Sequence, residues 1–128
     1  MSAPIPLLLV DDDDSSVLIL SALLEEEGFE VTTAMSTGEA RAAVSSRRVF
    51  SAALIDRNLD GEDGIALALE LRGCSSAIFI LSGDPPESER LVGIDGWFLK
   101  GTPFAEVVQR IRETLPGAQH RRRQSTPR

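Results

Sequence analysis

The feature that most constrains the fold is a pair of short apolar runs that each end in aspartate. Residues 52–55 (Ala-Ala-Leu-Ile) lead into Asp56, and residues 7–10 (Leu-Leu-Leu-Val) lead into four consecutive aspartates, 11–14. A continuous apolar run of this length is typical of a strand that is buried on both faces, as in a parallel sheet. Open parallel sheets bind ligands beyond the carboxyl ends of their strands. Both runs therefore point to carboxylates at a candidate site.

Carboxylates that share one crevice repel one another, so a cluster of three or more is costly unless a cation occupies it. Oxygen ligands favour a hard ion, and Mg²⁺ needs only one or two carboxylates together with water and a phosphate. We expect Asp14 or Ser15 to cap the following helix, which leaves Asp11 and Asp12 nearest the strand end as metal ligands. The alternative is that the acids only form turns and a helix cap.

Hydrophobic periodicity and capping residues predict strands alternating with helices along the whole chain. We expect strands over 7–10, 29–33, 52–56, 77–81 and 96–99, and helices over 16–27, 37–46, 64–72, 87–92 and 103–115. Gly28 should stop the first helix, and the expected N-caps of the second, third and last helices are Ser36 (with Glu39), Asp63 and Thr102. The segment over 87–92 has room for under two helical turns. This alternation indicates a doubly wound α/β sandwich.

Length and composition indicate one globular domain. The chain has 128 residues and 42% hydrophobic content, which suits one core and is too little for two comfortable domains. Cys74 is the only cysteine, so the chain cannot form an intramolecular disulfide, which suits a reducing cytosol. The longest apolar run near the start is too short for a signal peptide or a membrane span. We therefore expect a soluble, cytoplasmic protein that does not bind membranes.

The charge is distributed unevenly along the chain. Net charge is −7, but residues 119–128 hold four Arg and no acid, which leaves 9 Lys and Arg against 20 Asp and Glu in residues 1–118. So acidic a body does not favour direct binding to nucleic acid. We expect a folded domain over 1–118 and a basic flexible tail or linker over 119–128.

Polar residues also end the fourth and fifth predicted strands, namely Ser82 and Lys100. Because the carboxyl ends of parallel strands meet at one edge of a sheet, we expect both residues to lie near Asp11, Asp12 and Asp56. Phosphoryl transfer uses a metal ion, a fixed ammonium and a hydroxyl to neutralise the phosphate oxygens. Asp56 can serve as the nucleophile and form an aspartyl-phosphate. The set of residues therefore predicts phosphoryl chemistry.

Residues 7–115 resemble the receiver domain of two-component response regulators. The matching segments are LLLVDDDD, ALID with Gly64 eight residues after its aspartate, ILSG and GWFLK. The resemblance implies a flavodoxin-like (βα)5 sandwich with a parallel five-stranded sheet of order 2-1-3-4-5. It also implies a signalling domain, not a turnover enzyme, that takes a phosphoryl group from a sensor histidine kinase or a phosphotransfer protein in the presence of Mg²⁺ or Mn²⁺. It allows a homodimer.

The same resemblance implies a role for each strand-end residue. Asp56 would be the phosphoacceptor, assisted by Lys100 and Ser82. The metal would be held by the side chains of Asp11, Asp12 and Asp56 and by the backbone carbonyl of Asn58. Ser82 and Trp97 would form the switch, and Asn58 and Asp84 would influence how fast the phosphate is lost.

Three features bear on how this chain would differ from its relatives. Asp60 stands where the family usually has Pro, which we expect to loosen the loop and add negative charge. The stretch from Ser82 to Lys100 is about one helical turn shorter than usual, so we expect a shortened fourth helix. GWFLKGTP resembles the NarL/FixJ branch, whose output is a LuxR-type helix-turn-helix, and residues 125–128 (Ser-Thr-Pro-Arg) resemble the start of that output domain.

These features predict a domain that controls a DNA-binding domain absent from this chain. A stand-alone regulator or phosphorelay intermediate is the alternative. A Mg²⁺-dependent phosphatase of the haloacid dehalogenase kind also begins with a strand that ends in Asp-x-Asp, but it needs a longer core. A dinucleotide-binding module would need a Gly-rich turn after the first strand, which this sequence lacks.

Overall fold

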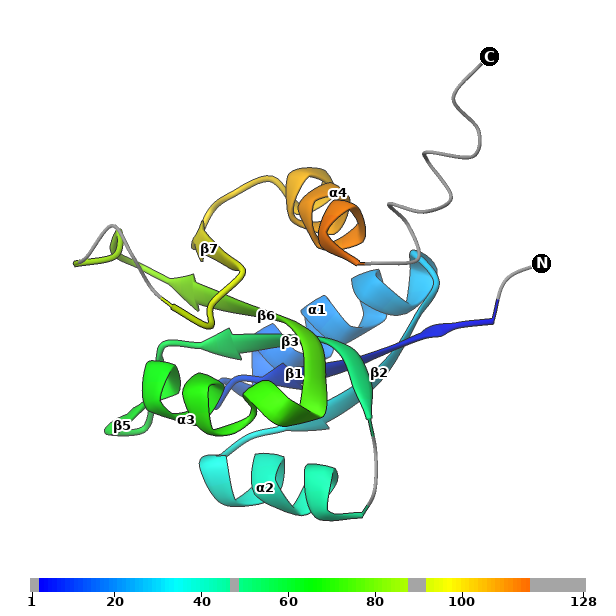
Figure 1. The fold of residues 1–128 in the computed structure, drawn as a ribbon. Helices are drawn as coiled ribbons and strands as arrows, with labels where there is room; N and C mark the ends of the chain where they lie inside the picture. Colours follow the sequence, from blue (N-terminus) through cyan, green and yellow to red (C-terminus); the bar gives the residue numbers. More distant parts are fainter. Residues whose placement is uncertain (1–2, 47–48, 88–91, 116–128) are drawn as a thin grey trace.

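The computed structural model describes residues 3–46, 49–87 and 92–115, and its centre is a five-stranded parallel sheet (Figure 1). The strands, in chain order, are β1 (Ile5–Val10), β2 (Phe29–Ala34), β3 (Phe50–Asp56), β6 (Ser75–Ser82) and β7 (Gly96–Leu99). Their spatial order is β2-β1-β3-β6-β7. Numbered within this sheet alone, that order is the predicted 2-1-3-4-5, so the predicted fold class is confirmed.

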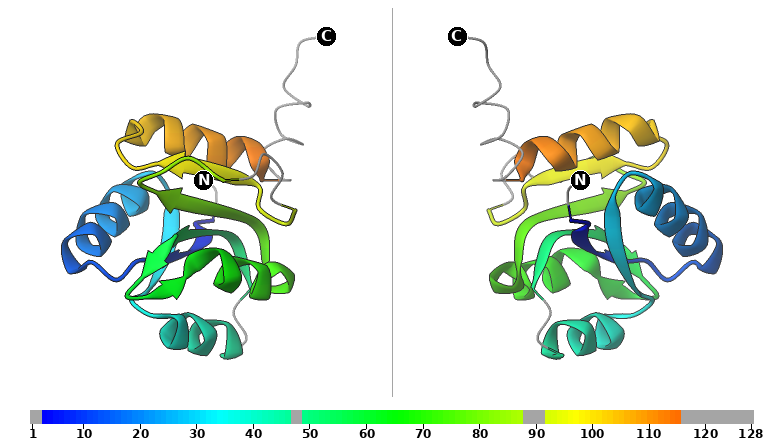
Figure 2. Two further views of the ribbon diagram at one scale, coloured as in Figure 1. Left: turned by 90° about the vertical axis from the view of Figure 1, so that its left-hand side faces the viewer. Right: turned by 90° about the vertical axis from the view of Figure 1, so that its right-hand side faces the viewer.

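Helices cover both faces of the sheet. They are α1 (Asp14–Glu26), α2 (Thr37–Ser45), α3 (Gly64–Glu70), the 3₁₀ turn η1 (Arg72–Cys74) and α4 (Phe104–Thr114). One core joins alternate residues of the strands to α1 and α4, and the other joins the remaining residues to α2 and α3 (Figure 2). In β1, for example, Leu7 and Leu9 face the first core while Leu8 and Val10 face the second. Burial on both faces explains the unbroken apolar runs of the sequence.

The strands and helices lie close to the predicted ranges, with one addition and one open point. The addition is a short antiparallel hairpin of β4 (Asn58–Leu59) and β5 (Glu62–Asp63), which we did not predict. The open point is the shortened fourth helix, because the predicted range 87–92 falls mostly outside the described residues. Within the described part of the chain, no helix has the length and apolar character needed to cross a bilayer.

The hairpin corrects the expectation that Asp60 loosens its loop. Only Asp60 and Gly61 separate the paired residues Leu59 and Glu62, and their φ angles are 51° and 87°. Two consecutive positive φ angles in a two-residue loop define the turn whose twist suits a β-hairpin, and Asp-Gly is among its preferred sequences. Asp60 therefore belongs to a tight turn.

Two of the expected helix caps are also wrong. Asp13, not Asp14 or Ser15, caps α1: its backbone is extended and its carboxylate accepts the N–H of Ser16 at 2.9 Å. The helix begins two residues before the predicted range of 16–27, so Asp14 is already helical. Thr102 does not cap α4; its hydroxyl donates to the carbonyl of Leu99 in the preceding turn.

The caps predicted for the other two helices are confirmed. The Ser36 hydroxyl accepts the N–H of Glu39 at 3.0 Å, and the Asp63 carboxylate accepts the N–H of Ile65 at the same distance. Gly28 ends α1 with a φ of 98°, which a residue without a side chain adopts readily.

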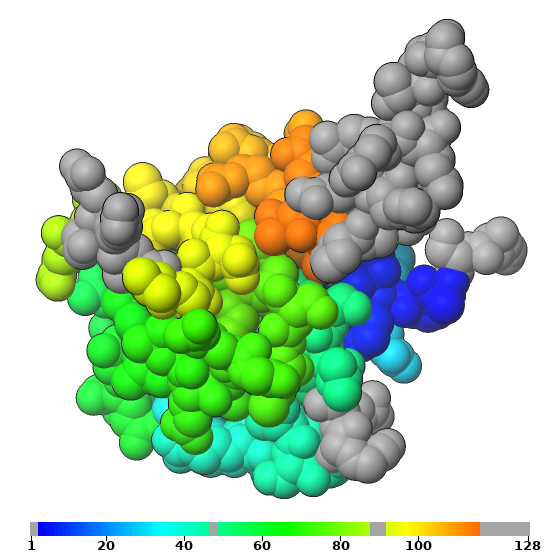
Figure 3. Space-filling model, viewed as in Figure 1, coloured from blue at the N-terminus to red at the C-terminus, as the bar shows by residue number. Residues whose placement is uncertain are grey.

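The start of β7 is held by contacts from two other elements. The Asp95 carboxylate accepts the N–H of Ile78 at 2.7 Å, and the Asp95 N–H donates to the Ile78 carbonyl at 2.7 Å. The Arg72 side chain fills the space where a Cβ of Gly93 would stand, 2.7 Å from that position. Figure 3 shows the segment before β7 (yellow) bordering α3 and η1 (green). These contacts anchor the start of the strand that leads to Trp97 and Lys100.

Candidate functional site

The candidate site lies at the carboxyl edge of the sheet. Asp56 and Ser82 are the last residues of β3 and β6, while Asp11 and Lys100 directly follow β1 and β7. The strand register places Val10 beside Ile55 and Ser82 beside Leu99, so these ends are level with one another. The structure thus brings together four residues that the sequence spreads from position 11 to position 100.

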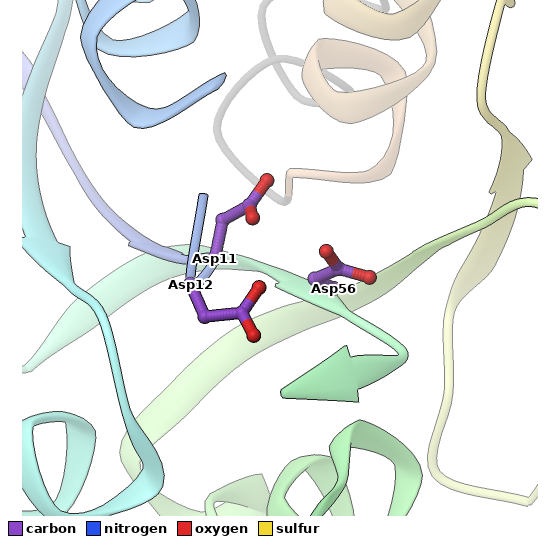
Figure 4. A group of neighbouring side chains, drawn as sticks. All are labelled: Asp11, Asp12 and Asp56. Atoms are coloured by element: carbon purple, nitrogen blue, oxygen red, sulfur yellow. The ribbon is translucent and has the colours of Figure 1, made fainter. Parts of the chain in front are cut away.

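Three carboxylates form the acidic part of the site (Figure 4). Asp11, Asp12 and Asp56 each offer one oxygen, and these oxygens all lie within 4.8 Å of one another. Asp11 is 2% exposed and Asp56 is 4% exposed, while Asp12 lies closer to solvent. A cluster of oxygen donors alone suits a hard divalent cation such as Mg²⁺ or Mn²⁺. The residues present therefore fit the predicted metal.

The pKa of Asp11 reflects its burial and its repulsion by Asp56 within this cluster. Burial is the main cause that raises its pKa, from an ordinary value of 3.8 to about 6, and the nearby Asp56 carboxylate raises the pKa further. The Asp13 N–H, which donates to Asp11 Oδ1 at 3.0 Å, opposes the rise, as does the charge of Lys100. The ionised form of Asp11 is thus disfavoured in the protein without metal, and a bound cation would offset that cost.

Both oxygens of Asp56 have defined partners. Oδ2 accepts a hydrogen bond from Lys100 Nζ at 3.2 Å, and Oδ1 accepts the backbone N–H of Asn58 at 3.1 Å. The Lys100 side chain is about half exposed (51%), so its ammonium reaches the buried carboxylate from the solvent side. This pair orients Asp56 and places one positive charge at the mouth of an acidic site.

Gly64 supports the backbone of Asp56. A Cβ on Gly64 would stand 2.0 Å from the Asp56 carbonyl oxygen, so no side chain fits there. The Gly64 N–H also donates to the Arg57 carbonyl at 2.6 Å. The start of α3 is therefore packed directly against the chain that carries the candidate phosphoacceptor, which explains why glycine occupies this position.

Ser82, Asp84 and Trp97 are linked by hydrogen bonds beside the site. Ser82 is 2% exposed, and its hydroxyl oxygen accepts the N–H of Asp84 at 3.0 Å. The Asp84 carbonyl in turn accepts the indole N–H of Trp97 at 2.9 Å. Trp97 is half-buried and packs against the core on the α2 and α3 side. The two predicted switch residues are thus connected through Asp84.

Arg57 is the neighbour that sequence reasoning missed. Its guanidinium carbon lies 5.7 Å from the centroid of the Trp97 ring, and its nitrogen lies 3.5 Å from a carboxylate oxygen of Glu87. The only hint of a role for Arg57 in the sequence is its position directly after Asp56. Its partners Trp97 and Glu87 lie far along the chain. No pattern of local spacing indicates such a contact.

Comparison with known families shows to which family the chain belongs. A model of the response regulator receiver domain matches residues 7–112, which is most of the chain. The chain belongs to this family. The predicted family is thereby confirmed, and the phosphatase and dinucleotide-binding classes are set aside.

Relatives of this receiver domain include a longer regulator and several solved structures. It is 30% identical to the transcriptional regulatory protein AruR of Pseudomonas aeruginosa in an alignment that covers 94% of this chain and 53% of AruR. The chain therefore spans about half the length of that relative.

Two solved structures share the fold at moderate identity. The receiver domain (CheY-like) from Methylobacillus flagellatus is 27% identical, with a TM-score of 0.74 over 85% of this chain and 99% of that one. The response regulator TrrA from Thermotoga maritima, solved with Mg²⁺-BeF, is 25% identical, with a TM-score of 0.76 over 87% of this chain and 99% of that one. The receiver domain described here is similar to both along nearly their whole length.

Proposed function

We propose that this receiver domain accepts a phosphoryl group on Asp56 from the phosphohistidine of a sensor histidine kinase or of a phosphotransfer protein. The observation that carries the proposal is a buried carboxylate at an open sheet edge, held by one lysine and bordered by two further acids. A carboxylate in this arrangement can act as a nucleophile whose product is a covalent acyl phosphate. One P–O bond forms at Asp56 as the P–N bond of the donor breaks.

Mg²⁺ or Mn²⁺ would be held by the carboxylates of Asp11, Asp12 and Asp56 and by the backbone carbonyl of Asn58. When bound, the ion would neutralise phosphate oxygens next to these acids. The presence of Mg²⁺ in the TrrA complex supports this assignment, as does the all-oxygen donor set.

The other residues of the site would bind and orient the phosphoryl group. The ammonium of Lys100, which already reaches Asp56, would pair with one phosphoryl oxygen, and the hydroxyl of Ser82 would donate to another. Asn58 and Asp84 flank the site and would influence the access of water to the acyl phosphate. The domain would catalyse only the phosphorylation of its own Asp56. Its role would therefore be signalling and not the turnover of a substrate.

Phosphorylation would then change the face around β6, β7 and α4. Movement of the Ser82 hydroxyl toward the phosphoryl group would disturb its bond to Asp84, and through Asp84 the bond to the Trp97 indole. The phosphoryl group can shift this equilibrium only by binding the two states with different affinity. Trp97 is the only tryptophan, so its fluorescence should report the change.

The partner would dock beside α1. A groove of about 340 Å³ runs between α1 and the start of α4 and reaches Asp11 and Lys100. Ile19 and Leu99 line it and are 58% and 44% exposed, and Leu18 on α1 is 71% exposed. A kinase or phosphotransfer protein that brings its histidine to this edge would cover these apolar side chains. The predicted cytoplasmic location belongs to the same proposal.

The output of the domain is proposed from the longer relative. AruR is a transcriptional regulatory protein and is about twice as long as the aligned segment. We infer that residues 1–118 form the receiver and that 119–128 form a linker to a DNA-binding domain of the LuxR type. Sequencing the source gene past codon 128 tests this: helix-turn-helix patterning would support the inference, and an immediate stop codon would favour a stand-alone regulator. The predicted homodimer stays a prediction.

Intact-mass measurement tests the phosphorylation. The protein is incubated with a small phosphodonor and Mg²⁺, and we expect the mass of one phosphoryl group to be added. Asp56→Asn should abolish the addition, and excess chelator should suppress it. Asp60→Asn is the matched control, because it removes one exposed acid close to the site but outside the cluster. Equal labelling of the Asp56→Asn protein, or undiminished labelling in chelator, would contradict the proposal.

A further inference from the structure

Arg57 is fixed between the phosphoacceptor and the switch tryptophan. Its backbone N–H donates to the Leu81 carbonyl at 2.9 Å, and its carbonyl accepts the N–H of Gly64 at 2.6 Å. Both backbone groups are therefore engaged, so the direction in which the side chain leaves the chain is set by β6 and α3. The side chain itself is 22% exposed and ends over the Trp97 ring.

Trp97 is consequently held at two places. Its indole N–H donates to the Asp84 carbonyl at 2.9 Å, and its ring lies 5.7 Å from the guanidinium carbon of Arg57. A guanidinium within about 6 Å of an indole centroid is attracted by the ring, and Trp is the best of the aromatic partners. Leaving this position would cost Trp97 both contacts.

Glu87 also contacts Arg57 but contributes little. The Glu87 side chain is 83% exposed and its oxygen lies 3.5 Å from the Arg57 nitrogen. Exposed ion pairs of this kind are worth little because water screens both charges. The contact between Arg57 and the ring is therefore the one that can bias the position of Trp97.

We propose that Arg57 is a positioning residue that holds Trp97 in the conformation in which the Ser82 hydroxyl accepts the N–H of Asp84, and that it so sets how readily the domain switches. This inference rests on the proposed phosphorylation of Asp56. A contact present in only one of two states shifts the balance between them by its own free energy. Removing the contact therefore favours the phosphorylated conformation and tightens the binding of any ligand that requires it.

The test measures the affinity for beryllofluoride, a stand-in for the phosphoryl group, by calorimetry in the presence of Mg²⁺. Arg57→Ala removes the guanidinium and the stem that carries it, and we expect it to tighten binding about two- to fivefold, the ratio that a partly exposed cation–π contact provides. Arg57→Lys keeps a cation and should stay closer to the native affinity. Glu87→Gln removes only the ion pair and should leave the affinity unchanged.

A spectroscopic measurement accompanies the affinities. Without beryllofluoride, acrylamide should quench Trp97 fluorescence more strongly in Arg57→Ala than in the native protein or in Glu87→Gln, because the ring loses the side chain that covers it. An affinity of Arg57→Ala that equals or falls below the native one would overturn the proposal. So would an equal gain in Glu87→Gln, because the ion pair would then carry the effect.

A failure of the proposed phosphorylation of Asp56 would give a different result from a failure of the inference about Arg57. If Asp56→Asn bound beryllofluoride as tightly as the native protein, phosphorylation of Asp56 would be the part that fails. Quenching of the metal-free protein would still report whether Arg57 covers Trp97, since that measurement involves no phosphate mimic.

Discussion

Replacing Asp11 by Asn should stabilise the metal-free protein, and the gain should depend on pH. Asn keeps the oxygen that accepts the Asp13 N–H, so the local hydrogen bond is retained. It removes a carboxylate that is buried and that lies beside Asp56. The substitution therefore isolates the cost of holding a negative charge at this position.

The magnitude follows from the pKa of Asp11, which is raised from 3.8 to about 6. Between these two pH values the folded protein binds more protons than the unfolded chain, so the free energy of unfolding falls as the pH rises. The loss is nearly complete at about pH 7, where it amounts to about 3 kcal/mol, and it is under about 1 kcal/mol near pH 4. Asp11→Asn should recover these amounts.

Urea unfolding in excess chelator, followed by Trp97 fluorescence, measures the effect. We expect Asp11→Asn to exceed the native free energy of unfolding by about 3 kcal/mol near pH 7 and by much less near pH 4. Glu30→Gln is the control, because it removes one exposed acid near the start of β2, away from the carboxyl edge. A gain that is the same at both pH values, or no larger than that of Glu30→Gln, would refute the reasoning.

Three other substitutions or additions test separate features. Mg²⁺ at about 100 times its dissociation constant should raise the free energy of unfolding by about 2.7 kcal/mol. Asp12→Asn should remove most of this gain. A thermal midpoint that does not move with Mg²⁺ would argue against a metal site. Gly64→Ala should cost at least about 2 kcal/mol because its Cβ would meet the Asp56 carbonyl, whereas Gly73→Ala, with open space around it, should be nearly neutral in the same urea titration. Asp60→Pro should destabilise the folded protein by more than about 1 kcal/mol, although it restores the residue usual in the family, because proline cannot adopt the φ of 51°. Asp60→Gly should not destabilise it. Equal unfolding midpoints for the two variants would contradict the hairpin.

Some features that the sequence did not lead us to expect carry a recognisable signal. Asp60-Gly61 is a preferred two-residue hairpin sequence and by itself predicts the turn that the structure shows. We missed it because we compared Asp60 only with the proline that is usual in the family. Asp13 is as good a cap as Asp14 or Ser15, and four acids in a row leave the choice open. The first helical residue depends on where β1 ends against its neighbours, which short-range patterns do not specify.

The sequence by itself determined the order of the elements and the residues at the strand ends. Apolar runs bounded by polar residues reflect burial on both faces, and that burial depends mainly on side-chain type. Asp56, Ser82 and Lys100 could be placed at the same sheet edge because parallel strands bring their carboxyl ends together. The resemblance to receiver domains then assigned each of these residues a role.

Only the tertiary structure decided how those residues interact. The pKa of Asp11 depends on how deeply the chain buries it and on the approach of Asp56. The need for glycine at position 64 depends on the path of the Asp56 backbone, and the cover of Trp97 depends on the direction of the Arg57 side chain. These are distances between residues far apart in sequence, and burial, repulsion and steric contact change steeply with distance, so no local pattern of residue types encodes them.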